Sequence, residues 1–99
     1  MSIVIQCVDD DHTALAVRRL LLSTKGYAVL TATSADAALR LFNCNHVDLV
    51  ITDHLLRDGT GAHVTSQMKR LRPEVPIVLL TAWPNGSPAG QSDYVHGVK

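Results

Sequence analysis

The sequence predicts an α/β fold, an open parallel sheet with helices on both faces. Short apolar runs rich in β-branched residues alternate with helical patterns between residues 3 and 82, and polar residues follow three of the four runs. Strands joined by helical crossovers run parallel, so the strand–helix order predicts a parallel sheet. With 99 residues, the chain has room for one domain, which we expect to span residues 1–99.

The first half of the chain contains two strand–helix units. Residues 3–8 form a short apolar run that stops at three aspartates, as expected for a strand buried on both faces. Residues 12–25 carry apolar side chains at helical spacing, and Gly26 follows where a left-handed helix cap favours glycine. Residues 27–31 are the second predicted strand, and Ser34 can cap the helix after it.

The second half repeats this pattern. Residues 47–52 are the third predicted strand, and residues 55–61 contain an Asp-Gly pair typical of a loop. Apolar residues at steps of four and three over 64–71 predict a third helix, which Pro73 ends. Residues 76–80 are the fourth predicted strand.

Acidic and hydroxyl side chains follow these strands. Asp9 and Asp10 come after the first strand, Asp53 after the third and Thr81 after the fourth, so a parallel sheet brings them to one edge. Two carboxylates about 4 Å apart repel each other by about 4 kcal/mol at an effective dielectric constant near 20. Such a cluster must protonate, admit water or bind a cation, and Mg²⁺ prefers oxygen ligands of this kind. A carboxylate beside the ion can also attack phosphorus and form an acyl phosphate.

Composition excludes several other classes of protein. Nine Lys and Arg residues balance nine Asp and Glu residues, so no net positive field favours direct nucleic-acid binding. No apolar stretch approaches the roughly 20 residues of a membrane-spanning helix, and the first residues lack the basic region of a signal peptide. Two cysteines make neither a disulfide framework nor a paired metal motif. We therefore expect a cytoplasmic protein with no membrane contact.

From residue 1 to about residue 83, the chain resembles the receiver domain of bacterial response regulators. The resemblance rests on VDD after the first strand, VDLVITDHLLRDGTG over residues 47–61 and PIVLLTA over residues 76–82. It implies a flavodoxin-like sheet of strand order 2-1-3-4-(5). The parentheses mark that the sequence does not decide whether this chain contains the fifth strand. It also implies a two-component signalling domain rather than an enzyme, with an output partner that the sequence does not identify.

The resemblance also implies a role for each site residue. Asp53 is the implied phosphoacceptor, which takes a phosphoryl group from a histidine kinase. Thr81 is the implied switch hydroxyl, and Ala82 is the small neighbour that leaves Asp53 accessible. The implied ligands of Mg²⁺ are Asp9, Asp10, Asp53 and the backbone carbonyl of Leu55.

The chain departs from the family after Thr81. Residues 83–90 have the composition of a loop where the family has its fourth helix. In one interpretation residues 93–99 form the fifth strand, and Lys99 is the phosphate-binding lysine of the family. In the other, Ser87 caps a short fourth helix and the chain stops before the fifth strand, so that it contains no such lysine.

In both interpretations the last helix of the family is missing. Apolar strand surface beside the first helix is then left open, and exposing a few hundred Å² of it costs several kcal/mol at about 25 cal/mol per Å². We therefore expect either that the chain is a fragment of a longer protein or that a second copy covers this face in a homodimer.

Two other functions fit parts of the sequence. One is a receiver-like module that binds partners without being phosphorylated. It fits the interpretation in which the chain contains no phosphate-binding lysine. The run Asp9-Asp10-Asp11-His12-Thr13 fits the DxDxT pattern of haloacid-dehalogenase-type phosphohydrolases, with Asp9 as nucleophile and Asp11 as acid/base. The modified residue discriminates between the two phosphorylated classes: Asp53 in a receiver, Asp9 in the hydrolase.

Overall fold

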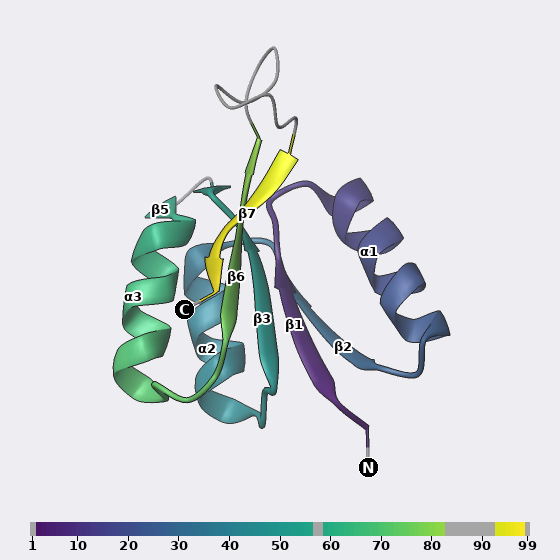
Figure 1. Ribbon diagram of the computed structural model, residues 1–99, viewed down its shortest axis with the longest axis horizontal. Helices are drawn as coiled ribbons and strands as arrows, with labels where there is room; N and C mark the ends of the chain where they lie inside the picture. The colour runs from purple at the N-terminus through teal and green to yellow at the C-terminus, as the bar shows by residue number, and fades with distance from the viewer. Residues whose placement is uncertain (1, 57–58, 83–92, 99) are drawn as a thin grey trace.

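The computed structural model describes residues 2–56, 59–82 and 93–98, and it contains one five-stranded sheet flanked by helices (Figure 1). The helices are α1 (His12–Thr24), α2 (Ala35–Cys44) and α3 (Gly61–Leu71). The strands of the sheet are β1 (Val4–Val8), β2 (Ala28–Ala32), β3 (Leu49–Asp53), β6 (Ile77–Ala82) and β7 (Asp93–Val98). Their order is β2-β1-β3-β6-β7, and the first four run parallel. The predicted α/β class and strand order are confirmed.

Side-chain caps fix where each helix begins. The Asp11 side chain caps α1, and the Ser34 hydroxyl accepts the Ala37 N–H at the start of α2, as the sequence predicts. Thr60 caps α3 in the same way. Gly26 follows α1 with a φ of 92°, the left-handed conformation expected there.

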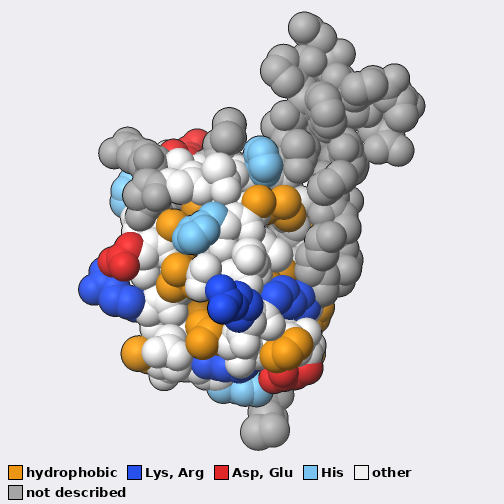
Figure 2. Space-filling view, turned by 90° about the vertical axis from the view of Figure 1, so that its left-hand side faces the viewer, with side chains coloured by type: hydrophobic (Ala, Val, Ile, Leu, Met, Phe, Trp, Pro, Cys, Tyr) orange, Lys and Arg blue, Asp and Glu red, His pale blue; other side chains and the backbone are white. Residues whose placement is uncertain are grey.

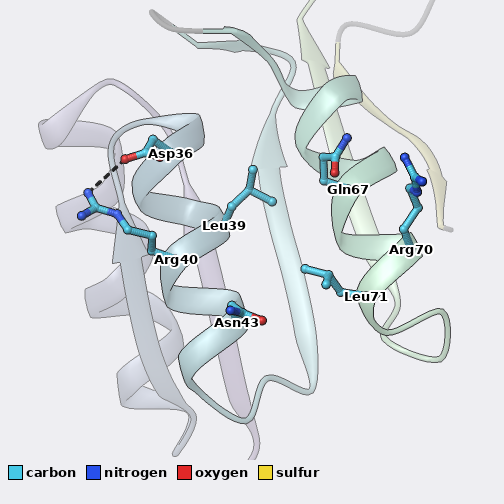
Figure 3. Close-up of a pocket in the computed structure, with 7 residues that line it drawn as sticks. All are labelled: Asp36, Leu39, Arg40, Asn43, Gln67, Arg70 and Leu71. Carbon is cyan, nitrogen blue, oxygen red and sulfur yellow. Dashed lines mark ion pairs between the residues drawn. The ribbon is translucent and has the colours of Figure 1, made fainter.

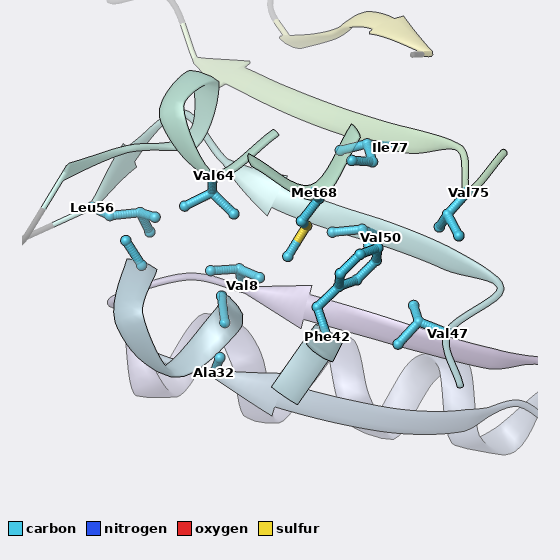
Figure 4. Packing of buried hydrophobic residues seen from close by; sticks show 12 residues of the cluster. Val8, Ala32, Phe42, Val47, Val50, Leu56, Val64, Met68, Val75 and Ile77 are labelled. Carbon is cyan, nitrogen blue, oxygen red and sulfur yellow. The ribbon is translucent and has the colours of Figure 1, made fainter. Parts of the chain in front are cut away.

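Helices α2 and α3 cover one face of the sheet and enclose the larger core (Figures 1 and 4). Phe42 of α2 and Met68 of α3 are completely buried against the strand residues Val50 and Ile77. At the lower end of this layer the Arg72 guanidinium lies 4.5 Å from the Phe42 ring centroid and donates hydrogen bonds to carbonyls at the end of α2. The two helices are therefore tied to each other as well as to the sheet.

Helix α1 alone covers the other face within the described part of the chain (Figure 1). Its Leu15 packs on Ile5 and Cys7, while Leu49 and Ile51 at the centre of the sheet remain half-buried. The helix also exposes apolar side chains to solvent: Val17, Leu20 and Leu21 are 53%, 65% and 60% exposed. Within the described residues, apolar side chains of α1 are thus exposed on this side of the sheet. The open strand surface beside the first helix, and its covering by a second copy or by further chain, stay predictions.

Strand β7 differs from the parallel fifth strand that the resemblance implies, because it runs antiparallel to β6. Asp93 pairs with Ala82, and Val98 pairs with Val78, so β7 returns directly along β6. A parallel strand would need a longer crossover that carries the chain back across the sheet. Lys99, the predicted phosphate-binding residue, lies outside the described residues, as does Ser87; the neighbouring Val98 lies at the opposite end of β6 from Thr81.

Residues 55–61, predicted as a loop, contain two short strands and the start of α3. Strands β4 (Leu55–Leu56) and β5 (Gly59–Thr60) pair antiparallel, and the Gly61 N–H then donates to the His54 carbonyl at 2.7 Å. Gly61 is buried, and a Cβ there would lie 2.6 Å from Leu79 Cδ1 and nearer still to the carbonyl oxygen of Asp53. Only glycine therefore allows α3 to begin so close to the end of β3.

We predict that Gly61→Ala lowers the free energy of unfolding by about 1–3 kcal/mol, because the added methyl overpacks a site with backbone on one side. Gly59→Ala is the matched control, since its Cβ would meet only Ala35 Cβ at an ordinary 3.7 Å. Urea unfolding followed by circular dichroism measures both variants. Equal stability of the two variants would contradict this account of Gly61.

Candidate functional site

Three aspartates meet at the carboxyl edge of the sheet, where the sequence places them. Asp9 and Asp10 directly follow β1, and Asp53 is the last residue of β3. The neighbouring parallel strands pair Val8 with Thr52, which brings the residues that follow side by side. One carboxylate oxygen from each aspartate lies within 4.8 Å of the other two. Residues 44 positions apart in the sequence thus form one cluster.

One backbone N–H group and one cation hold Asp9 in this cluster. Asp9 is only 6% exposed, and its Oδ1 accepts the Asp11 N–H at 2.9 Å. Its Oδ2 lies 3.6 Å from Nη1 of Arg18, which reaches the cluster from α1. Asp11 itself is exposed and outside the cluster, because its carboxylate caps α1 by accepting the Thr13 and Ala14 N–H groups. Its engagement as a cap disfavours the acid/base role that a hydrolase would need.

The Asp53 carboxyl is half-buried, and burial raises its pKa above the usual range for an aspartate. The negative charges of Asp9 and Asp10 raise the pKa further. A hydrogen bond from the His54 N–H to Oδ1 (2.9 Å) and the positive charge of Arg18 act in the opposite direction. A cation bound beside Asp53 would therefore stabilise its ionised carboxylate and lower its pKa.

The chemistry of the donor set fits a hard divalent cation. Three carboxylates supply several oxygen ligands within reach of one another, and Mg²⁺ binds such oxygens while it keeps part of its water shell. Leu55, whose backbone carbonyl was predicted as a further ligand, begins β4 two residues after Asp53. The residues present could thus hold a magnesium ion.

The predicted switch residues lie on the adjacent strand. Thr81 and Ala82 are the last residues of β6, and Leu80, just before them, pairs with Asp53. Their backbone is therefore next to the cluster, at the same edge of the sheet. Their assigned roles stay predictions.

Sequence reasoning missed two residues that shape this site. Gly61 lets α3 begin against the backbone of Asp53, and Arg18 contributes the cation beside Asp9. A signal for Arg18 was present: it stands between Leu15 and Leu22 at steps of three and four, on the stripe of α1 that faces the sheet. A charged residue on an apolar stripe of this kind indicates that a polar group lies beneath it.

A separate groove lies between α2 and α3, and it is lined by none of the three clustered aspartates Asp9, Asp10 and Asp53 (Figure 3). Leu39 and Leu71 point into it, and Arg40 and Arg70 lie at its sides. Figure 2 shows that basic side chains (blue) lie beside apolar ones (orange) on this face of the molecule. No helix of the described residues is long and apolar enough to span a bilayer.

Comparisons with known proteins agree with this geometry. The transcriptional regulatory protein GlrR of Escherichia coli K12 is 37% identical over 75 residues, which cover 76% of this chain and 17% of GlrR. The response regulator SaeR of Staphylococcus aureus USA300 is 29% identical, with 76% of this chain and 32% of SaeR covered. The chain thus spans between about a sixth and a third of the length of these relatives.

Solved structures share the fold. A CheY-like receiver domain protein of Methanospirillum hungatei matches with a TM-score of 0.82 and 26% identity, over 91% of this chain and 70% of that one. The response regulator TrrA of Thermotoga maritima, solved in complex with Mg²⁺–BeF, matches with a TM-score of 0.79 and 29% identity, over 86% and 73% of the two chains. The family model described as the response regulator receiver domain matches residues 5–94. With strand order, acidic edge and these similarities in agreement, the chain belongs to the family of response regulator receiver domains.

Proposed function

We propose that this receiver domain accepts a phosphoryl group from a histidine kinase on Asp53, with Mg²⁺ held by the aspartate cluster. The observation that carries this proposal is the convergence of Asp9, Asp10 and Asp53, with oxygens within 4.8 Å of one another. The complex of TrrA with Mg²⁺–BeF supports it, because a protein of the same fold takes that ion and phosphoryl mimic. The proposed location is the cytoplasm.

The proposed reaction is a nucleophilic transfer. An Asp53 carboxylate oxygen attacks the phosphorus of a phosphohistidine, the P–N bond breaks, and the departing imidazole keeps the electron pair and takes up a proton. The His54 N–H bonded to Oδ1 orients the carboxylate for this attack. A bound Mg²⁺ would shield the charge of the incoming phosphoryl oxygens.

The ligands of that ion are proposed to be the three aspartates and the backbone carbonyl of Leu55. Asp9 is the most buried of the three carboxylates, and its Oδ1 is engaged by the Asp11 N–H. Asp10 is half-buried and thus more open to water and to an ion. This division supports direct ligation by Asp10 and assistance by Asp9.

The proposed output is a population shift at the end of β6. The phosphoryl group brings almost two negative charges and three acceptor oxygens to the edge of the sheet. Thr81 and Ala82 end β6, the strand that pairs with β3, and the proposed switch is Thr81 binding a phosphoryl oxygen. A partner that binds one of the two arrangements more tightly then responds to phosphorylation.

Acetyl phosphate tests the phosphoacceptor directly. With Mg²⁺ present, we expect a labile adduct of about 80 Da, the mass of one phosphoryl group, on Asp53. Asp53→Asn removes the adduct, while Asp36→Asn, which changes an exposed carboxyl on α2, keeps it. Mass spectrometry of the intact chain and its peptides gives the readout. A folded protein that gains no adduct would instead support the binding module that works without phosphorylation. An adduct on Asp9 would support the hydrolase.

The raised pKa of Asp53 gives a second prediction, about stability. Because the folded state holds this carboxyl at a higher pKa than the unfolded chain does, its ionisation destabilises the fold at pH values above the folded pKa. In chelator-treated buffer, Asp53→Asn should therefore raise the melting temperature at pH 7. The gain should shrink as the pH falls through the folded pKa, and it should vanish below the usual aspartate value of about 3.9, where both states hold the proton.

Differential scanning calorimetry across this pH range measures the effect. Asp36→Asn is again the control, because its exposed carboxyl is not part of the aspartate cluster. A stabilisation by Asp53→Asn that stayed constant from pH 7 to pH 4 would contradict an electrostatic origin.

A further inference from the structure

Arg18 occupies an unusual position on α1. It lies on the stripe of the helix that faces the sheet, and its side chain is only 25% exposed. The Nη1 atom is buried, and no described residue accepts a hydrogen bond from it. The nearest anion is Oδ2 of Asp9, at 3.6 Å. A guanidinium is always charged, so the structure places a permanent positive charge beside Asp9 of the aspartate cluster.

The charge of Arg18 acts on more than Asp9. It opposes the rise in the pKa of Asp53, and it is the one cationic side chain of the described residues that does so. The three aspartates carry three negative charges when ionised, and Arg18 reduces this to two. A divalent ion and Arg18 are therefore attracted to the same carboxylates and repel each other.

We propose that Arg18 is a built-in counter-ion of the aspartate cluster, which holds Asp9 when no ion is bound and weakens the binding of Mg²⁺. This inference rests on the proposed magnesium-dependent function. In it Arg18 is a positioning residue, because its guanidinium is paired with Asp9 and supplies no ligand to the ion. When a phosphoryl group adds negative charge, the same guanidinium offsets part of it.

The unpartnered hydrogen-bond donor on Arg18 Nη1 supports this role. A guanidinium has five N–H donors, and a buried donor without a partner is costly in a finished core. At 3.6 Å, Nη1 and Asp9 attract each other as charges but are too far apart for a hydrogen bond. The pair is therefore poised to tighten when negative charge increases and to loosen when a cation arrives.

Replacing Arg18 by methionine tests the proposal, since methionine keeps an unbranched apolar stem and loses the charge. We expect Arg18→Met to bind Mg²⁺ about tenfold more tightly than the wild type, because even in a medium as polar as water one charge a few ångströms from a divalent ion has an effect of this size. Isothermal titration calorimetry at low ionic strength measures the affinity. Arg18→Lys, which keeps the charge, should bind Mg²⁺ within a few-fold of the wild type.

Arg19→Met is the matched control, because it removes the same charge from the next residue of α1, whose side chain is exposed. Its affinity for Mg²⁺ should stay within about twofold of the wild type, since an exposed charge is screened by salt and water. A purely structural role of Arg18 predicts looser binding once the site is disturbed. Unchanged or weaker binding by Arg18→Met would therefore overturn the proposal.

A metal-free double-mutant cycle separates this proposal from the proposed function. Thermal unfolding in chelator-treated buffer compares the wild type, Arg18→Met, Asp9→Asn and the double variant. If Arg18 is the counter-ion, Arg18→Met lowers the melting temperature, and most of this loss disappears in the Asp9→Asn background. Additive effects would overturn the counter-ion. Failure of Asp53 to accept phosphate would instead overturn the proposed function and leave the result of the cycle unaffected.

Discussion

Repulsion among three carboxylates that cannot move apart is the constraint on which the rest of this structure depends. The register of β1 and β3 pairs Val8 with Thr52, both completely buried, so the aspartates that follow are held together by the core beneath them. The start of α3 is also held against the end of β3, because Gly61 lies against the backbone of Asp53 and its N–H donates to the His54 carbonyl. The sheet thus holds an unfavourable charge arrangement that a bound cation would relieve.

The two faces of the sheet support this edge unequally. Helices α2 and α3 enclose a core with fully buried Phe42 and Met68, while α1 covers the opposite face with Leu15 as its one fully enclosed residue. Elements with few buried contacts open at lower free energy than those with many. We therefore expect α1, where Arg18 lies, to open at lower free energy than α2 and α3.

The fold was predictable because its signals are local and agree with one another. Alternating strand and helix patterns, Ser34 as a cap and Gly26 after α1 are each written in a few residues, and parallel pairing then brings Asp9, Asp10 and Asp53 to one edge. The direction of β7 was not predicted, although residues 83–92, between β6 and β7, are few for the crossover that a parallel strand needs. The hairpin of β4 and β5 is too short to give a periodic signal.

Arg18 shows why a site can be predicted only in part. Its position on the helix was visible in the sequence, but the distance from its guanidinium to Asp9 depends on how α1 packs across β1. The three aspartates, in contrast, are placed by backbone pairing alone, which requires no knowledge of side-chain packing. Residues that follow parallel strands can therefore be assigned to a site from sequence, whereas residues that reach it from a covering helix need the packed structure. In this receiver domain Arg18, which reaches the site from the covering helix α1, offsets part of the negative charge of the aspartates that follow the parallel strands.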